Sequence, residues 1–331
     1  NYCRVYVDKL VEFELGKGFS INHKDEVNDV LLNGLPIAEF LDNVWLDNEK
    51  EKLVTDIGQM KAVTGDSWVQ VKFEAPGQFS DPFREYPNGR VRIVVIPTSI
   101  CFPKYDSHDK DKLVQLTIAY PISNFSRKLT GGYKEKQVLY KQIWTENDFT
   151  VVEDGKETVV SNPYGVIPFV QIKNISVAGR SYGLSDLIDI IPLNVELNLK
   201  KSDISEIIDY HAAPVTVIFG ASVKSLEKGA NKIWGGLPKD ANVKNLELVG
   251  NLDASVNYIQ SLKVDMNEIA RVPEGSLGGK QSISNTSGVA LQFVNMPIVE
   301  RTRQKRVCTL QGIRNINKLI LYNGCPIIIW H

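Results

Sequence analysis

The segment GRSYGLSDLIDIIPLNVELNLKKSDISEIIDYHAAPVTVIFG (residues 179–220) marks the sharpest change of pattern along the chain. Ser185 is placed to cap a helix. Behind it, apolar residues recur at helical spacing, at Leu187, Ile191, Val195 and Leu199. Pro192 favours either a second helix start or a kink, and Pro214 requires the helix to end by Ala213. A strand is predicted directly after Pro214.

Two further helices are predicted downstream of residue 220. A Lys- and Gly-rich stretch at 224–250 precedes a second predicted helix at 252–272, which ends at Val272-Pro273. A polar Gly/Ser loop then leads to a third helix from about Val289, which we expect to be interrupted at Pro297. Two helices of 20–25 residues would each be about 30–38 Å long. The second half therefore predicts a long helical hairpin with a small β module at its tip.

The pattern in the first half of the chain predicts a folded α+β part from which this hairpin extends. Residues 1–75 show helical spacing up to Gly16 and again over 37–63, followed by an alternating strand at 67–73. Residues 90–173 predict a meander with one solvated face. Its predicted strands are 91–96, 113–120, 137–144, 149–152, 157–160 and 167–172. The fold class is α+β.

Composition limits the possible functions. The chain has 331 residues, 43% of them hydrophobic and 23% charged, with a formal charge of -1. This length favours two or more packed units. The charge argues against a surface that coats nucleic acid, although duplex could still pass along it without being gripped. The four cysteines lack metal or disulfide spacing, which indicates free thiols. No apolar run has the length of a membrane span.

The sequence contains no convincing catalytic, phosphate-binding or metal-binding motif. The stretch EGSLGGKQS (274–282) departs from a phosphate-binding loop because Glu274 replaces the first glycine and Gln281 the Ser/Thr, and because a helix precedes it. The four histidines lack ligand spacing, and DSHDKD (106–111) is better explained as a solvated hairpin tip than as a cation loop. We expect no enzymatic activity, no metal and no cofactor.

The first long helix is acidic. It carries six acids against Lys200 and Lys201, namely Asp186, Asp189, Glu196, Asp203, Glu206 and Asp209. One interpretation is a solvated helix face with a Glu196–Lys200 pair. The other is an acidic surface that repels phosphate, so that DNA slides past it. The sequence leaves both open.

Five motifs resemble the portal proteins of tailed bacteriophages, which are head-to-tail connector subunits. They are NPYGVIPFVQIKN (162–174), GRSYGLSDLIDIIPLNVELN (179–198), AAPVTVIFG (212–220), ARVPEGSLGG (270–279) and SNTSGVALQF (284–293). Their order, behind an α+β segment, extends the resemblance over most of the chain.

The resemblance implies a portal-like fold with a wing, a two-helix stem, a clip, a tunnel loop and a long kinked helix. These parts would be a wing at 1–183, stem helices at 184–212 and 252–272, a clip at 213–251, a tunnel loop at 273–287, and a returning wing helix and strand at 288–331, without a crown in this chain. It further implies a homo-oligomeric ring, commonly of twelve subunits, at one capsid vertex of the virion. Double-stranded DNA would pass through it without sequence recognition, and terminase, adaptor and capsid proteins would dock on it. No membrane partner is expected.

The resemblance also assigns candidate sites. The tunnel loop would face DNA through Lys280, Gln281, Ser282 and Asn285, although a plain helix–helix linker would look similar. The clip would meet partners through Lys228, Lys232, Trp234 and Lys239, unless Trp234 packs internally. The stem would present Asp189, Glu196, Asp203 and Glu206 to the channel. The basic run Arg301, Arg303, Lys305 and Arg306 would face DNA, a neighbour's acids or solvent.

Two rival functions remain at this point. A tail or baseplate adaptor would also use a helical hairpin with a β tip, but would not enclose DNA. A nuclease or nucleotide hydrolase would need acids that converge on a metal, whereas the acids here are spread along helix faces.

Overall fold

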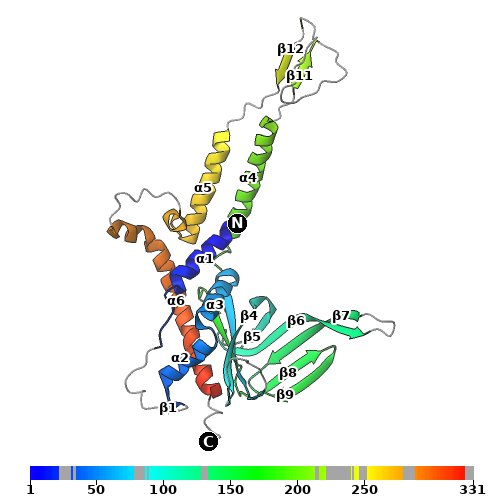
Figure 1. Ribbon diagram of the computed structural model, residues 1–331, viewed down its shortest axis with the longest axis vertical. Coiled ribbons are helices and arrows are strands. Elements are labelled where there is room, and N and C mark those ends of the chain that lie inside the picture. Colours follow the sequence, from blue (N-terminus) through cyan, green and yellow to red (C-terminus); the bar gives the residue numbers. More distant parts are fainter. Residues whose placement is uncertain are drawn as a thin grey trace. The chain divides into compact units, whose positions relative to one another are not determined.

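The computed structural model describes eleven stretches of the chain (Figure 1). They are residues 1–21, 31–32, 35–77, 86–87, 89–127, 133–212, 216–220, 240, 242–245, 252–278 and 288–324. The chain divides into two compact units. The first comprises Asn1–Ile190 and Ile269–His331, and the second comprises Ile191–Glu268.

A three-stranded antiparallel sheet forms the centre of the first unit. Its order is β10 (Phe169–Lys173), β3 (Asp66–Glu74) and β4 (Arg90–Ile96). The pleat of β3 directs Val69 and Val71 into a core with helices α2 (Ile37–Asp47), α3 (Lys50–Thr64) and α6 (Gly288–Gly324). Trp68, on the opposite face of the same strand, packs into a second core. Both faces of the sheet are therefore covered.

The second core lies against a five-stranded antiparallel meander. The strands follow chain order, as β5 (Cys101–Tyr105), β6 (Leu113–Arg127), β7 (Tyr133–Trp144), β8 (Asp148–Glu153) and β9 (Lys156–Ser161). Leu116, Ile118 and Trp144 pack there with Trp68 and Phe169. A short 3-10 turn, Thr98–Ile100, leads from the first sheet into the second. The two sheets thus share one apolar layer.

Helix α1 (Tyr2–Leu15) and helix α6 complete the first unit. Gly58 lets α1 approach α3, because a Cβ there would lie 2.6 Å from Leu15 Cδ1. Gly312 likewise lets α6 approach β10, since a Cβ there would lie 2.6 Å from Ile172 Cγ1. A short hairpin, β1 (Leu31–Leu32) with β2 (Leu35–Pro36), precedes α2.

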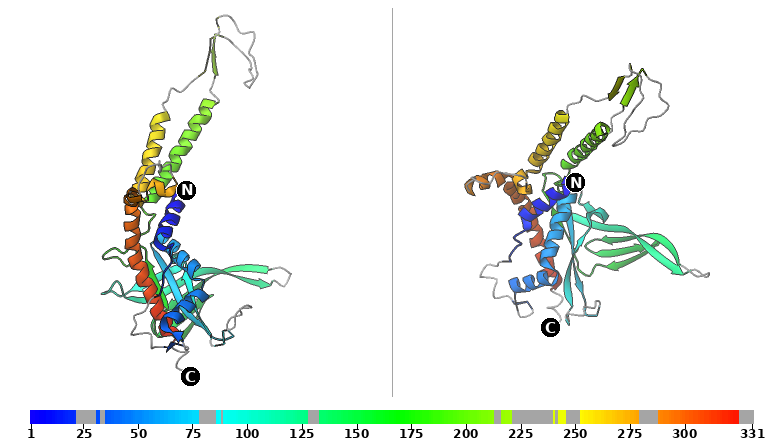
Figure 2. Two further views of the ribbon diagram at one scale, coloured as in Figure 1. Left: turned by 60° about the vertical axis from the view of Figure 1, so that its left-hand side comes forward. Right: turned by 45° about the horizontal axis from the view of Figure 1, so that its top comes forward.

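The second unit consists of two helices and a small strand pair. Helix α4 (Ile190–Ala212) and helix α5 (Leu252–Ala270) lie side by side in every view (Figures 1 and 2). Between them in sequence, β11 (Thr216–Phe219) pairs antiparallel with β12 (Asn242–Asn245). After α5 comes a 3-10 turn, Glu274–Leu277, which belongs to the first unit.

Several sequence expectations need correction. The helix predicted over 37–63 is two helices, because Asn48 leaves the helix to bind β4: its Nδ2 donates to Val91 O (2.9 Å) and its Oδ1 accepts from Ile93 N (2.8 Å). Glu49 follows with a φ of 54°. The strands predicted at 91–96 and 167–172 belong to the sheet of β3, not to the meander.

Other boundaries differ near the prolines. Helix α6 continues through Pro297 instead of being interrupted there, and it changes direction in its N-terminal part (Figure 1). Proline removes one helical hydrogen bond, which bends a helix that packing holds on both sides. Helix α4 begins at Ile190 and not near Ser185, with Pro192 in its first turn, where the missing N–H costs nothing.

Candidate functional site

Five charged side chains meet inside the first unit. Lys305 Nζ lies 2.7 Å from Asp186 Oδ2 and 3.3 Å from Glu14 Oε2, while Lys61 Nζ lies 2.6 Å from Glu14 Oε1. Arg301 adds a contact of 3.1 Å to Asp186 Oδ1. The Glu14, Lys61 and Lys305 side chains are 0% exposed. Burial lowers the pKa of Lys61, and the neighbouring Glu14 acts in the opposite direction. We call these five residues the buried ion network.

The network joins four parts of the chain that are distant in sequence. Glu14 is on α1, Lys61 on α3, Arg301 and Lys305 on α6, and Asp186 in the turn before α4. Buried charges are tolerated only when they are paired in this way. The network therefore ties the turn that leads into α4 to the helices of the first unit.

This geometry corrects the expectation for the basic run. Lys305 and Arg301 face acids of their own chain, not DNA or a neighbour. Arg306 donates to the backbone carbonyls of Glu14 (2.9 Å) and Phe13. Arg303 is exposed. The helical spacing of α6 explains the division, because residues 301 and 305 share one face while residue 303 points elsewhere.

Backbone contacts hold the same turn. Gly65 and Gly183 approach so closely that a Cβ on Gly183 would lie 2.3 Å from Gly65 O. The Asp66 carboxylate accepts hydrogen bonds from Gly183 N (3.1 Å) and Gln171 Nε2 (2.9 Å), and burial raises its pKa. Ser185 Oγ donates to Val63 O and accepts from Leu187 N. The motif GRSYGLSD thus has a structural role in docking this turn onto β3 and α3.

The acids expected on the channel face lie on α4 and just before it. Asp189 is in the turn that precedes the helix, whereas Glu196 and Asp203 are seven residues apart on α4 and therefore form one stripe. Lys200 lies within that stripe, 3.1 Å from Asp203 Oδ2 and 3.9 Å from Glu196 Oε1, and the hydrogen bond to Asp203 raises the pKa of Lys200. Glu206 follows Asp203 by three residues, so it is about 60° from Asp203 around the helix and borders the same stripe. Exposure of the stripe fits both a solvated face and a phosphate-repelling face.

An apolar stripe runs along another side of α4. Ile191, Val195 and Leu199 are 50%, 51% and 55% exposed, at a spacing of four residues. Leu197, on the opposite side of the helix, is fully buried. A helix that is apolar on two opposed sides can be covered on both. We call Ile191, Val195 and Leu199 the exposed stripe.

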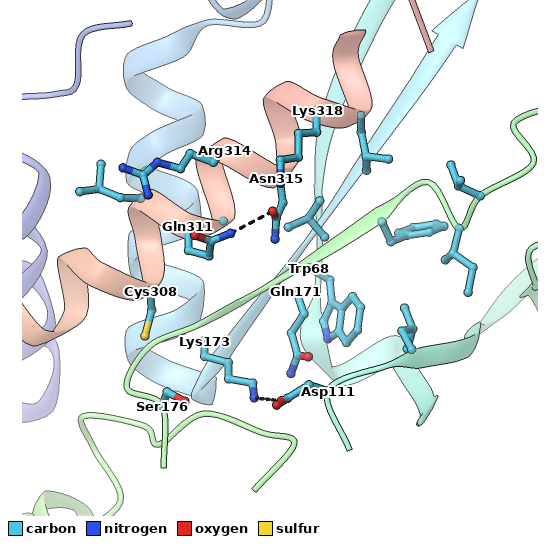
Figure 3. A pocket seen from close by; sticks show the side chains of 18 of the residues that line it. Trp68, Asp111, Gln171, Lys173, Ser176, Cys308, Gln311, Arg314, Asn315 and Lys318 are labelled. Carbon is cyan, nitrogen blue, oxygen red and sulfur yellow. Dashed lines mark hydrogen bonds and ion pairs between the residues drawn. The ribbon is translucent and has the colours of Figure 1, made fainter. Parts of the chain in front are cut away.

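A cavity of about 960 Å³ lies in the first unit beside α6 (Figure 3). Gln311, Arg314, Asn315 and Lys318 follow α6 along one side. Asp111, Gln171 and Lys173 lie across from them, and Lys173 Nζ contacts Asp111 Oδ1 at 3.2 Å. On the α6 side, Gln311 Nε2 donates to Asn315 Oδ1 at 3.2 Å. In the parts of the chain that the structure describes, no three His, Cys, Asp or Glu side chains gather to hold a metal ion.

An acid surrounded by bases sits at the end of β3. Glu74 contacts Arg90 at 2.8 Å, Lys72 at 3.0 Å and Arg92 at 3.3 Å. Burial raises the pKa of Glu74, but the hydrogen bonds from these three cations outweigh it and lower the pKa to about 2. This cluster stabilises the edge of the three-stranded sheet near neutral pH.

Eight candidate residues lie outside the described residues. They are Lys280, Gln281, Ser282 and Asn285 of the expected tunnel loop and Lys228, Lys232, Trp234 and Lys239 of the expected clip.

The sequence reasoning did not find the buried ion network. A signal was present, because Glu14 follows Tyr6 and Leu10 at steps of four and so occupies the buried face of α1. A charge at such a position needs a buried partner. Which partner it meets depends on tertiary packing.

Comparison with known proteins identifies the family. The model of the family "Phage portal protein, SPP1 Gp6-like" matches residues 1–323. The chain therefore belongs to this family of phage portal proteins and is a virion component of the head-to-tail connector class.

Two further comparisons concern curated proteins and solved structures. No curated protein matches the chain. Among solved structures, a chain of "Virion of native gene transfer agent (GTA) particle" is similar at 12% identity and a TM-score of 0.46, over 86% of this chain and 72% of that chain. None of the described helices is long and apolar enough to cross a membrane.

Proposed function

We propose that copies of this chain form a closed ring at one capsid vertex, and that double-stranded DNA passes through the ring during packaging and ejection. The family match over residues 1–323 carries the proposal. Within it, 184–212 and 252–272 are the stem, 213–251 the clip and 273–287 the tunnel loop. Terminase, adaptor and capsid proteins are the partners, and twelve subunits is the expected copy number.

The exposed stripe on α4 supports ring formation. Its three side chains are half exposed, so covering them would stabilise each interface by about 1 kcal/mol per residue, or about 3 kcal/mol. Val256 and Val264 of α5 are also exposed, at 53% and 43%, and offer apolar surface for the stripe of an adjacent copy. Since α4 is also buried on its opposite side, it suits a position between its own unit and a neighbour.

The acidic stripe supports a passive conduit. Tight binding to duplex DNA depends on cations that replace the counterions of phosphate. Asp189, Glu196 and Asp203 offer carboxylates instead, with Lys200 paired among them. A channel face of this kind lets duplex slide instead of holding it. We propose that the chain itself carries out no catalytic step and that the ATP-driven work belongs to terminase.

Electron microscopy of the purified protein tests the proposal. We expect closed rings of one rotational symmetry, with a hole wide enough for duplex DNA. A closed oligomer without a through-channel would contradict the conduit and favour a tail or baseplate adaptor. A chain that stays monomeric at high concentration, with capsid and scaffold proteins present, would contradict the ring itself.

A further inference from the structure

Strands β6 and β7 extend far beyond the sheet that contains them. They pair from Leu116↔Trp144 to Arg127↔Tyr133. However, β5 accompanies β6 only as far as Ile118, and β8 accompanies β7 only from Lys141. The eight pairs from Tyr120↔Tyr140 onward form a two-stranded ribbon about 27 Å long. It projects away from the rest of its unit (Figures 1 and 2). We call residues 120–127 and 133–140 the arm.

An isolated two-stranded ribbon is only marginally stable in water. The arm nevertheless carries apolar side chains on both faces. Tyr120 and Tyr140 pack together on one face, with ring centroids 5.3 Å apart. On the other face Leu139, 51% exposed, lies directly opposite the exposed Pro121. Exposed apolar surface on a projecting ribbon indicates a partner that covers it.

The arm is also basic, and this selects the chemistry of the partner. By sequence it holds Arg127, Lys134 and Lys136 against Glu135, a formal charge of +2 on a chain whose total is -1. Lys136 has one ion pair in its own chain, to Asp154 at 2.7 Å, but both side chains are more than half exposed. Such exposed pairs contribute little and exchange readily. A partner surface should therefore be acidic and partly apolar.

The outer surface of α2 and α3 has that character. Five exposed acids lie on or between these helices, namely Glu39, Asp47, Glu49, Glu51 and Asp56. Two cations are exposed there as well: Lys52, paired with Glu49 at 3.2 Å, and Arg92 of the adjacent β4, which is 48% exposed and lines the same hollow as Asp47, Glu49 and Asp56. Leu46, 58% exposed, adds apolar surface among the acids. This surface and the arm lie on opposite sides of the first unit (Figure 1 and the right-hand view of Figure 2).

We infer that the arm of one copy lies on the α2–α3 surface of the next copy; this inference rests on the proposed ring. A ring is closed by head-to-tail interfaces, which use two different patches on each subunit. Opposite charge and opposite placement are the properties that such a pair of patches needs. Pro121 has no N–H to offer a further strand at the β6 edge of the arm, which favours docking through a face of the arm.

Zero-length carbodiimide cross-linking of rings assembled from equal amounts of ¹⁴N- and ¹⁵N-labelled protein tests the contact directly. Mixed-isotope links should join Lys136 to acids of the α2–α3 surface, such as Glu51 or Asp56. Links from Lys136 that occur only within one chain, or that map to acids of the neighbour outside the α2–α3 surface, would overturn the inference.

Charge reversal provides the second test. Lys136→Glu, and separately Glu51→Lys with Asp56→Lys, should each raise the concentration at which rings assemble by about tenfold at low salt. Combining the three changes should restore assembly to within about threefold of the unaltered protein. Lys156→Glu is the matched control, because this residue is exposed and lies outside the arm. Sedimentation velocity measures assembly, and circular dichroism checks folding.

The outcomes separate this inference from the proposed function. Rings that form equally well in both reversed variants would refute the arm contact and leave the ring standing. Loss of duplex DNA binding with unchanged ring assembly in Lys136→Glu would show that the arm contacts DNA, and would also refute the arm contact. A chain that never oligomerises refutes both.

Discussion

Removing the amine at the centre of the buried ion network should destabilise the first unit strongly. Lys305→Ala deletes the cation that lies between Asp186 Oδ2 (2.7 Å) and Glu14 Oε2 (3.3 Å), in a site where all three side chains are at most 1% exposed. Breaking a buried ion pair typically costs 3–5 kcal/mol, because a buried charge loses its partner.

The remaining contacts place the effect at the lower end of that range. Asp186 would keep Arg301 at 3.1 Å, and Glu14 would keep Lys61 at 2.6 Å and the hydroxyl of Thr309 at 2.6 Å. We therefore expect the free energy of unfolding of the first unit to fall by about 3 kcal/mol.

Urea unfolding at pH 7, followed by tryptophan fluorescence, measures this change. Trp45 is a suitable reporter because it is fully buried in the same unit. The matched control is Arg303→Ala, an exposed cation on the same helix, which should change stability by less than about 0.5 kcal/mol. A cost below about 1 kcal/mol for Lys305→Ala, or equal costs for the two variants, would show that the network does not hold the unit together.

Four further predictions concern other parts of the molecule. Gly183→Ala should lower the free energy of unfolding by about 2–3 kcal/mol, measured by thermal denaturation, because the new Cβ would lie 2.3 Å from a carbonyl oxygen. Glu74 has a pKa held to about 2, so its contribution is complete above about pH 4.5 and is lost as the pH falls through 2. The stability difference between the unaltered protein and Glu74→Gln should therefore be full at pH 7 and vanish near pH 2 in urea titrations; a constant difference would contradict the pairing. Leu199→Asp should leave stability within about 0.5 kcal/mol but weaken ring assembly in sedimentation velocity, whereas intact assembly would exclude the exposed stripe from the interface. Burial raises the pKa of Cys101 to about 12, so iodoacetamide at pH 8 should label this thiol only after unfolding, as peptide mass spectrometry would show.

Local patterns predicted most of the elements. Periods of two and of 3.6 residues depend only on neighbours along the chain, and they placed the helices of the hairpin and the strands of the meander near their observed positions. Strand β5 was missed because Cys101–Tyr105 is short and contains a proline, which obscures alternation. The arm was missed in part, since residues 121–127 and 133–136 are mostly polar and owe their pairing to their partner strand.

The candidate site was less accessible from sequence. The acidic character of α4 was evident, but the sequence did not show that Asp189 lies in the turn before this helix. The basic run on α6 shows most clearly what could not be predicted from the sequence. Arg301 and Lys305 seemed available to DNA because charge is usually solvated, yet they pair with acids more than a hundred residues away.

By itself, the sequence determined the α+β class, the long hairpin with its β module, and the resemblance to phage portal proteins, because these depend on spacing and on the order of motifs. Tertiary structure alone decided that strands β4 and β10 join β3, that Glu14, Lys61, Asp186 and Lys305 meet, and that β6 and β7 project as an arm. The physical reason is that these features depend on contacts between residues distant in the chain. The partner of a strand edge or of a buried charge is chosen by how the whole unit packs, and local pattern does not contain that choice.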